Sequence, residues 1–64
     1  GRYHWADKRK FYINSRASAF EAESQIIQSK NLGFLTREQA QEGIDLCHNI
    51  QITLNGLIRK MSNP

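Results

Sequence analysis

The chain has 64 residues, of which 39% are hydrophobic and 23% charged, and its net charge is +3. This balance is typical of one small globular domain and excludes a disordered, collagenous or low-complexity chain. The 64 residues contain no long apolar run, so we expect no membrane span, no signal-peptide core and no membrane partner. The single cysteine, Cys47, excludes a disulfide framework and a multi-cysteine zinc site.

The first predicted helix covers about residues 7–31, because residues 1–6 show no apolar period. Two adjacent stripes at helical spacing predict a wide face of the kind that a bundle buries. The first stripe consists of Tyr12, Ser15, Ala19, Ala22, Ile26 and Ser29, and the second of Ile13, Ala17, Phe20, Ser24 and Ile27. We expect the charged residues of this helix to lie mostly off that face; they are Arg9, Lys10, Arg16, Glu23 and Lys30.

A tight connection over residues 32–35 is predicted to follow. Gly33 permits the left-handed conformation that stops a helix, and Thr36 with Gln39 has the spacing of a capping box. The second helix is therefore predicted over about residues 36–61. Its apolar stripe consists of Ala40, Ile44, Cys47, Ile50, Leu54, Leu57, Ile58 and Met61. Gly43 and Gly56 weaken this helix unless a neighbour packs closely there.

One stretch of the second helix also fits a strand. Residues 50–54 alternate apolar and polar side chains, and Asn55-Gly56 is a hairpin-turn pair. No second strand follows, because residues 57–61 return to the helical stripe. The prediction is therefore an all-α fold: a single antiparallel helical hairpin, residues 1–64, whose short connection makes its helices neighbours.

The basic N-terminal segment is the candidate binding site. Residues 1–16 hold five bases against one acid, Asp7, and the bases are Arg2, Lys8, Arg9, Lys10 and Arg16. Bases interleaved with aromatics such as Tyr3 and Trp5 suit phosphate contact and base stacking in RNA or DNA. The alternative interpretation is a solvated helix start whose aromatic residues cover the end of a bundle.

No residue pattern predicts catalysis. Cys47 lies on the apolar stripe and is expected to pack as a small hydrophobic residue. His4 and His48 lack metal-ligand spacing, and Glu38 and Glu42 are expected to form a solvated face. We expect no enzyme activity, no catalytic residue, no metal and no cofactor.

Several segments, in order, resemble one protein family. They are Gly1-Arg2-Tyr3-His4, Phe11-Tyr12-Ile13-Asn14-Ser15-Arg16-Ala17-Ser18 with Glu21, Leu32-Gly33-Phe34-Leu35-Thr36, and Leu54-Asn55-Gly56-Leu57-Ile58-Arg59. Together they resemble the four-helix bundle proteins known as 23S ribosomal RNA intervening-sequence proteins. Ala17 departs from the glycine usual at that position in the family. Family members are about twice as long, so the chain corresponds to their C-terminal half: a fragment, the product of a truncated gene, or a hairpin that rebuilds the bundle by self-association.

The resemblance implies an up-and-down four-helix bundle, here completed by self-association. It implies a homo-oligomer, a dimer or higher, since some members form rings of five bundles, and a bacterial, cytoplasmic location, which a free cysteine also fits. The family position of Glu21 implies a hydrogen bond across the bundle or an ion pair with a base. A related bundle engages a reverse transcriptase and nucleic acid. The predicted function is a non-catalytic, self-associating scaffold; the alternative is a nucleic-acid-binding accessory module acting through the basic segment.

Overall fold

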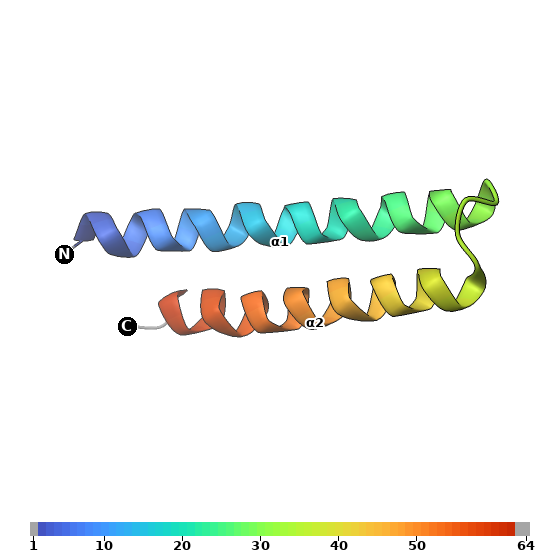
Figure 1. The fold of residues 1–64 in the computed structure, drawn as a ribbon. Coiled ribbons are helices and arrows are strands. Elements are labelled where there is room, and N and C mark those ends of the chain that lie inside the picture. Colours follow the sequence, from blue (N-terminus) through green and yellow to red (C-terminus); the bar gives the residue numbers. More distant parts are fainter. Residues whose placement is uncertain (1, 63–64) are drawn as a thin grey trace.

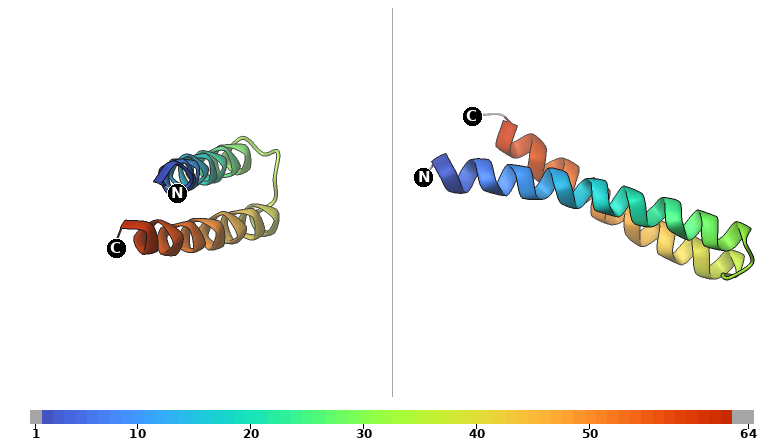
Figure 2. Two further views of the ribbon diagram at one scale, coloured as in Figure 1. Left: turned by 90° about the vertical axis from the view of Figure 1, so that its left-hand side faces the viewer. Right: turned by 90° about the horizontal axis from the view of Figure 1, so that it is seen from above.

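The protein is an antiparallel helical hairpin (Figure 1), seen here in a computed structural model that describes residues 2–62, with side chains described for residues 6–61. Helix α1 spans Arg2–Asn31 and helix α2 spans Arg37–Ser62. The two helices cross at a shallow angle, and the open end, where both termini lie, is opposite the loop (Figure 2). No strand occurs among residues 2–62, so residues 50–54 are helical.

Helix α1 begins earlier than its apolar period indicated. It starts at Arg2, whereas the period predicted a start near Asp7. An apolar period indicates which face of a helix packs against a neighbour. It does not detect helical turns that have no neighbour to pack against. The early start is compatible with the sequence, since residues 2–6 contain neither glycine nor proline.

The loop between the helices has the local geometry that its sequence predicts. Gly33 adopts a φ of 85°. The amide of Phe34 donates to the carbonyl of Ser29 (2.9 Å), and that of Gly33 donates to Lys30 (3.0 Å). This pair of bonds is a Schellman stop, which satisfies carbonyls that the helix end leaves free.

The start of α2 is a capping box. The amide of Gln39 donates to Oγ1 of Thr36 (3.0 Å), and the amide of Thr36 donates to Oε1 of Gln39 (2.9 Å). Each side chain satisfies a backbone donor of the other residue. Only residues 30–35 lie between Ser29, the first residue of the stop, and Thr36, the first residue of the cap. The chain therefore reverses direction within a short loop.

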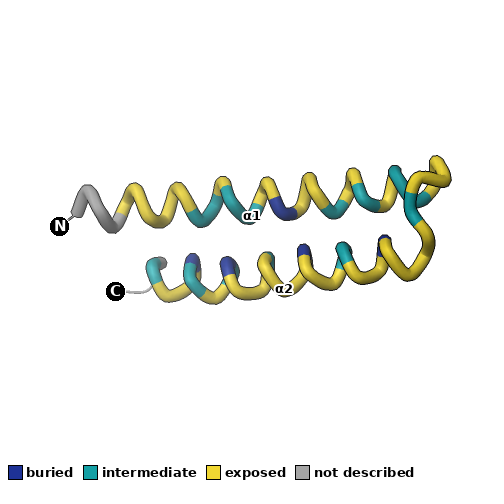
Figure 3. The backbone as a smooth tube through the Cα atoms, viewed as in Figure 1, coloured by how far each residue is buried: buried dark blue, intermediate teal, exposed yellow. Residues whose placement is uncertain are grey.

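The core lies along the seam between the helices and is narrow (Figure 3). Within the described side chains, the buried apolar residues are Ala19, Ala40, Cys47, Leu54 and Ile58. Only the first belongs to α1, which otherwise meets α2 through partly covered residues. Gly43 makes room for one of these, because a β-carbon there would lie 2.9 Å from Cδ1 of Ile26.

The buried face of α1 is narrower than the two stripes predicted. Of the first stripe, Ala22 is exposed, and of the second, Phe20 is 61% exposed and Ala17, Ser24 and Ile27 are exposed too. Arg16 and Glu23, expected off this face, are partly covered at the seam instead. On α2, Ile50 is half-exposed rather than covered. A single neighbouring helix covers one seam, whereas the predicted stripes need more than one neighbour.

Candidate interaction surfaces

A polar cluster joins the two helices along one side of the seam. Nη1 of Arg16 donates to Oδ1 of Asn55 (2.7 Å). Two turns further along α1, Oε1 of Glu23 accepts from Nε2 of Gln51 (2.8 Å) and lies 3.0 Å from Nε2 of His48. Glu23 is largely covered, with 17% of its side chain exposed, so these partners replace the water that its carboxylate loses.

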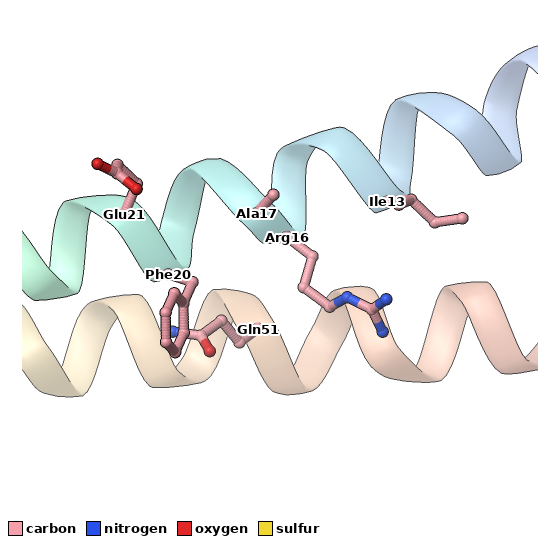
Figure 4. A pocket seen from close by; sticks show the side chains of 6 residues that line it. All are labelled: Ile13, Arg16, Ala17, Phe20, Glu21 and Gln51. Carbon is pink, nitrogen blue, oxygen red and sulfur yellow. The ribbon is translucent and has the colours of Figure 1, made fainter.

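The sequence singled out a different carboxylate for this role. Glu21 was expected to bond across the bundle or to pair with a base, but its side chain points away from α2 (Figure 4). Positions 21 and 23 differ by about 200° around a helix, so only one of them can face α2. The resemblance identified Glu21, and no spacing rule pointed to Glu23 with Gln51.

Beside this polar cluster, α1 presents a shallow depression of about 430 Å³. Phe20 and Arg16 extend from α1 toward α2, with Gln51 contributed by α2 (Figure 4). Ile13, Phe20 and Ile27 repeat every seven residues and form the apolar part of this surface, here named the Phe20 face. Two polar residues of the depression bond to residues beside it, Arg16 to Asn55 and Gln51 to Glu23.

The other side of the seam carries an uncharged apolar surface, here named the Leu46 face and defined by Ala22, Leu46, Ile50 and Leu57. Leu46 and His48 lie two positions apart, so they point to opposite sides of the hairpin. Ala22 and Ile50 immediately precede Glu23 and Gln51, which are bonded to each other, and so these two residues lie across from each other on this face. Leu46 is 60% and Ile50 is 50% exposed.

The Leu46 face is also hollowed. A depression of about 290 Å³ is lined by Leu46, Asn49, Ile50, Thr53 and Leu54. All of these lining residues belong to α2, and the lining is uncharged and mostly apolar. The small residue Ala22 of α1 lies beside the depression, opposite Ile50. Small residues allow a neighbouring helix to approach closely. Ala22 and Ile50 are among the residues that the apolar stripes predicted to be covered and that the hairpin leaves open.

The basic candidates from the sequence do not share one surface. Lys8, Arg9 and Lys10 are exposed, and because they are consecutive on α1 they point in directions about 100° apart. Arg16 instead faces α2 and bonds to Asn55. The side chains of Arg2, Tyr3 and Trp5 lie outside the described residues. Whether Tyr3 and Trp5 stack on bases or cover the end of a bundle therefore stays a prediction.

The hairpin brings two further bases to the same end of the molecule. Arg59 and Lys60 of α2 are exposed near the open end, opposite the first turns of α1 (Figure 1). Both lie in the last turn of α2, and an antiparallel hairpin sets that turn beside the start of α1. The sequence held this signal, but the candidate set drawn from residues 1–16 left both bases out.

The remaining candidates behave as packing and surface residues. Cys47 is buried, and Glu38 and Glu42 are exposed. Within the described side chains, no three histidine, cysteine, aspartate or glutamate residues come together as a metal ion would require. Neither helix, over its described length, is long and apolar enough to cross a membrane.

Comparisons with protein-family models, with curated proteins and with solved structures found no match to this chain.

Proposed function

We propose that this chain is a non-catalytic scaffold module whose hairpin associates with further copies of itself. The observation that carries the proposal is the Leu46 face, an apolar surface that the hairpin leaves open. In its centre, Leu46 is 60% and Ile50 is 50% exposed, although Ile50 belongs to the apolar stripe that was predicted to be buried. The resemblance to four-helix bundle proteins supports the same proposal, because a second hairpin would supply the two missing helices.

The exposed area of the chain agrees with an uncovered interface. The hairpin exposes 5272 Å² for a mass of 7.4 kDa, whereas a compact monomer of that mass exposes about 4200 Å². The excess of about 1000 Å² compares with the roughly 800 Å² that each partner buries in a standard protein interface. The hairpin is also elongated, because it consists of two long helices: the radius of gyration is 14.7 Å, against about 11 Å for a compact domain of this length.

Two matched variants test the proposal. Ile50→Lys places a charge in the Leu46 face, whereas Ile52→Lys places the same charge two positions away, on a residue that is 67% exposed on another side of α2. Size-exclusion chromatography with light scattering should give a multiple of the 7.4 kDa chain mass for the wild type and for Ile52→Lys, and the monomer for Ile50→Lys. A monomeric wild type, or equal masses for the two variants, would contradict the proposal.

A second candidate function is nucleic-acid binding at the open end. The observation that favours it is the gathering of Lys8, Arg9 and Lys10 with Arg59 and Lys60 around the same end of the hairpin. Lysine and arginine neutralise phosphates and release counterions, and an assembly of several chains multiplies a weak patch. This function is compatible with a scaffold, because none of the four residues that define the Leu46 face is a base.

Fluorescence anisotropy with a labelled single-stranded RNA tests this second candidate. Binding should weaken as salt rises, and the triple variant Lys8→Ala/Arg9→Ala/Lys10→Ala should make the slope of log K against log salt shallower by about two. The control variant Lys30→Ala/Arg37→Ala removes bases near the loop and should leave the slope unchanged. Salt-insensitive binding, or equal loss in both variants, would refute a role for the open end.

A further inference from the structure

The charges of the hairpin divide between its two ends. The open half, residues 6–16 and 51–61, holds six bases against one acid, a net charge of +5. The loop half, residues 17–50, holds two bases against five acids, a net charge of −3. The acids of the loop half are Glu21, Glu23, Glu38, Glu42 and Asp45. The sequence alone places the basic excess in residues 1–16, and the antiparallel fold adds Arg59 and Lys60 to it.

Two hairpins that share the Leu46 face by a twofold axis can be arranged in two ways. In one arrangement the open ends lie together, and in the other the open half of each copy covers the loop half of its partner. Both arrangements give every helix antiparallel neighbours, so helix dipoles do not choose between them. The net charges of the two halves favour the second arrangement. The first arrangement places open half on open half, +5 against +5, and loop half on loop half, −3 against −3. The second places an open half of +5 against a loop half of −3 twice.

We infer that the partner on the Leu46 face is a second copy of this chain in the opposite orientation, with its loop over the open end of the first. The inference rests on the proposed self-association and adds the orientation to it. The centre of the interface is uncharged, so like charges are not brought together there. The opposite charges of the two halves then meet across the edges of the face.

Lys60 and Glu42 are the residues that this orientation pairs. They lie nine residues on either side of Gln51, and eighteen residues, or five full turns, separate them, so both lie on the same side of α2. Glu42 precedes Leu46 by one turn, which places this row at the outer edge of the Leu46 face. A twofold axis near Gln51 sets Lys60 of each copy beside Glu42 of the other. If two copies shared the Leu46 face with their open ends together, Lys60 would instead lie near basic residues of the other copy.

Spin labels at the loop measure the orientation directly. Phe34 is 78% exposed, so a nitroxide on Phe34→Cys, in a chain with Cys47→Ala, leaves the Leu46 face unchanged. The hairpin is 48 Å long. In the opposite orientation the two labels should therefore lie roughly 45 Å apart, and with the open ends together about 20 Å or less. Double electron–electron resonance separates these distances.

A charge exchange in the chain with its native cysteine supplies a second measurement, by sedimentation equilibrium. Lys60→Glu should raise the dimer dissociation constant by roughly tenfold, since two pairs are lost and like charges meet. The double variant Lys60→Glu/Glu42→Lys, with the wild-type net charge, should restore it to within about threefold. A short label distance, tighter association of Lys60→Glu, or failure of the exchange to restore binding would overturn the orientation while leaving self-association intact. A monomeric wild type would overturn both.

Discussion

Replacing the two glycines of α2 by alanine tests how the helices meet at the seam. Alanine favours a helix over glycine by about 0.8–1.0 kcal/mol, because glycine loses more backbone entropy on folding. A β-carbon at Gly56 would meet nothing within 4 Å, so Gly56→Ala should keep the whole gain. At Gly43 the new β-carbon would lie 2.9 Å from Cδ1 of Ile26, closer than real contacts of this kind.

The contact at Gly43 should cancel the gain in helix propensity. Cδ1 is the far end of a flexible side chain, so moving it should cost about 1 kcal/mol, near the lower limit for overpacking. Gly43→Ala should therefore stay close to wild-type stability. For a chain of this size 1 kcal/mol corresponds to about 4–8 °C, so Gly56→Ala should raise Tm by about that amount while Gly43→Ala changes it by less than about 2 °C.

Thermal unfolding followed by far-ultraviolet circular dichroism measures both variants. All chains are compared at one concentration, because association makes Tm depend on concentration. An equal gain at the two positions would refute the packing of Ile26 against Gly43. A loss of stability in Gly56→Ala would refute the open surroundings of Gly56 and would mean that another chain covers that side of α2.

Three further predictions concern single contacts. Thr36→Ala should lower the free energy of unfolding, measured with urea, by about 1 kcal/mol, and Thr36→Ser should retain most of the cap; no loss would contradict its role. Glu23→Ala should lower the free energy of unfolding by about 1–2 kcal/mol, because its carboxylate contacts two partners, whereas Glu21→Ala should change it by no more than about 0.5 kcal/mol. Equal losses in the two variants would contradict this assignment. The thiol of Cys47 should react with a water-soluble disulfide reagent far faster in urea than in buffer, and equal rates would contradict its burial.

Local signals in the sequence were sufficient for the hairpin. Gly33 and the pair of Thr36 with Gln39 act through bonds within a few residues, so their spacing alone predicts the stop, the cap and the reversal between them. The burial of Cys47 followed from its place on the stripe of α2. These features depend on residues near each other in the chain, and periodicity describes such features well.

The bonds across the seam depend instead on the register of the two helices. Arg16 with Asn55 and Glu23 with Gln51 join positions that no local pattern relates. Apolar spacing treats every charged residue as a surface residue, and it therefore placed Arg16 and Glu23 on the wrong side. A long side chain at the edge of a narrow seam can cover apolar surface while its charged group meets a polar partner, and the period of apolar residues does not register this.

The narrow seam has a consequence for how the chain is stabilised. Among the described side chains, α1 buries only the small residue Ala19, and the largest residues that α2 buries are Leu54 and Ile58, so the helices enclose little apolar surface. A chain of this size is marginal without a further source of stability. In the proposed assembly the Leu46 face would be such a source, because covering it would extend the same core past Ala22 and Ile50. If association supplies this stability, folding and assembly are coupled, and Tm of the wild type should rise with chain concentration while Tm of Ile50→Lys should not.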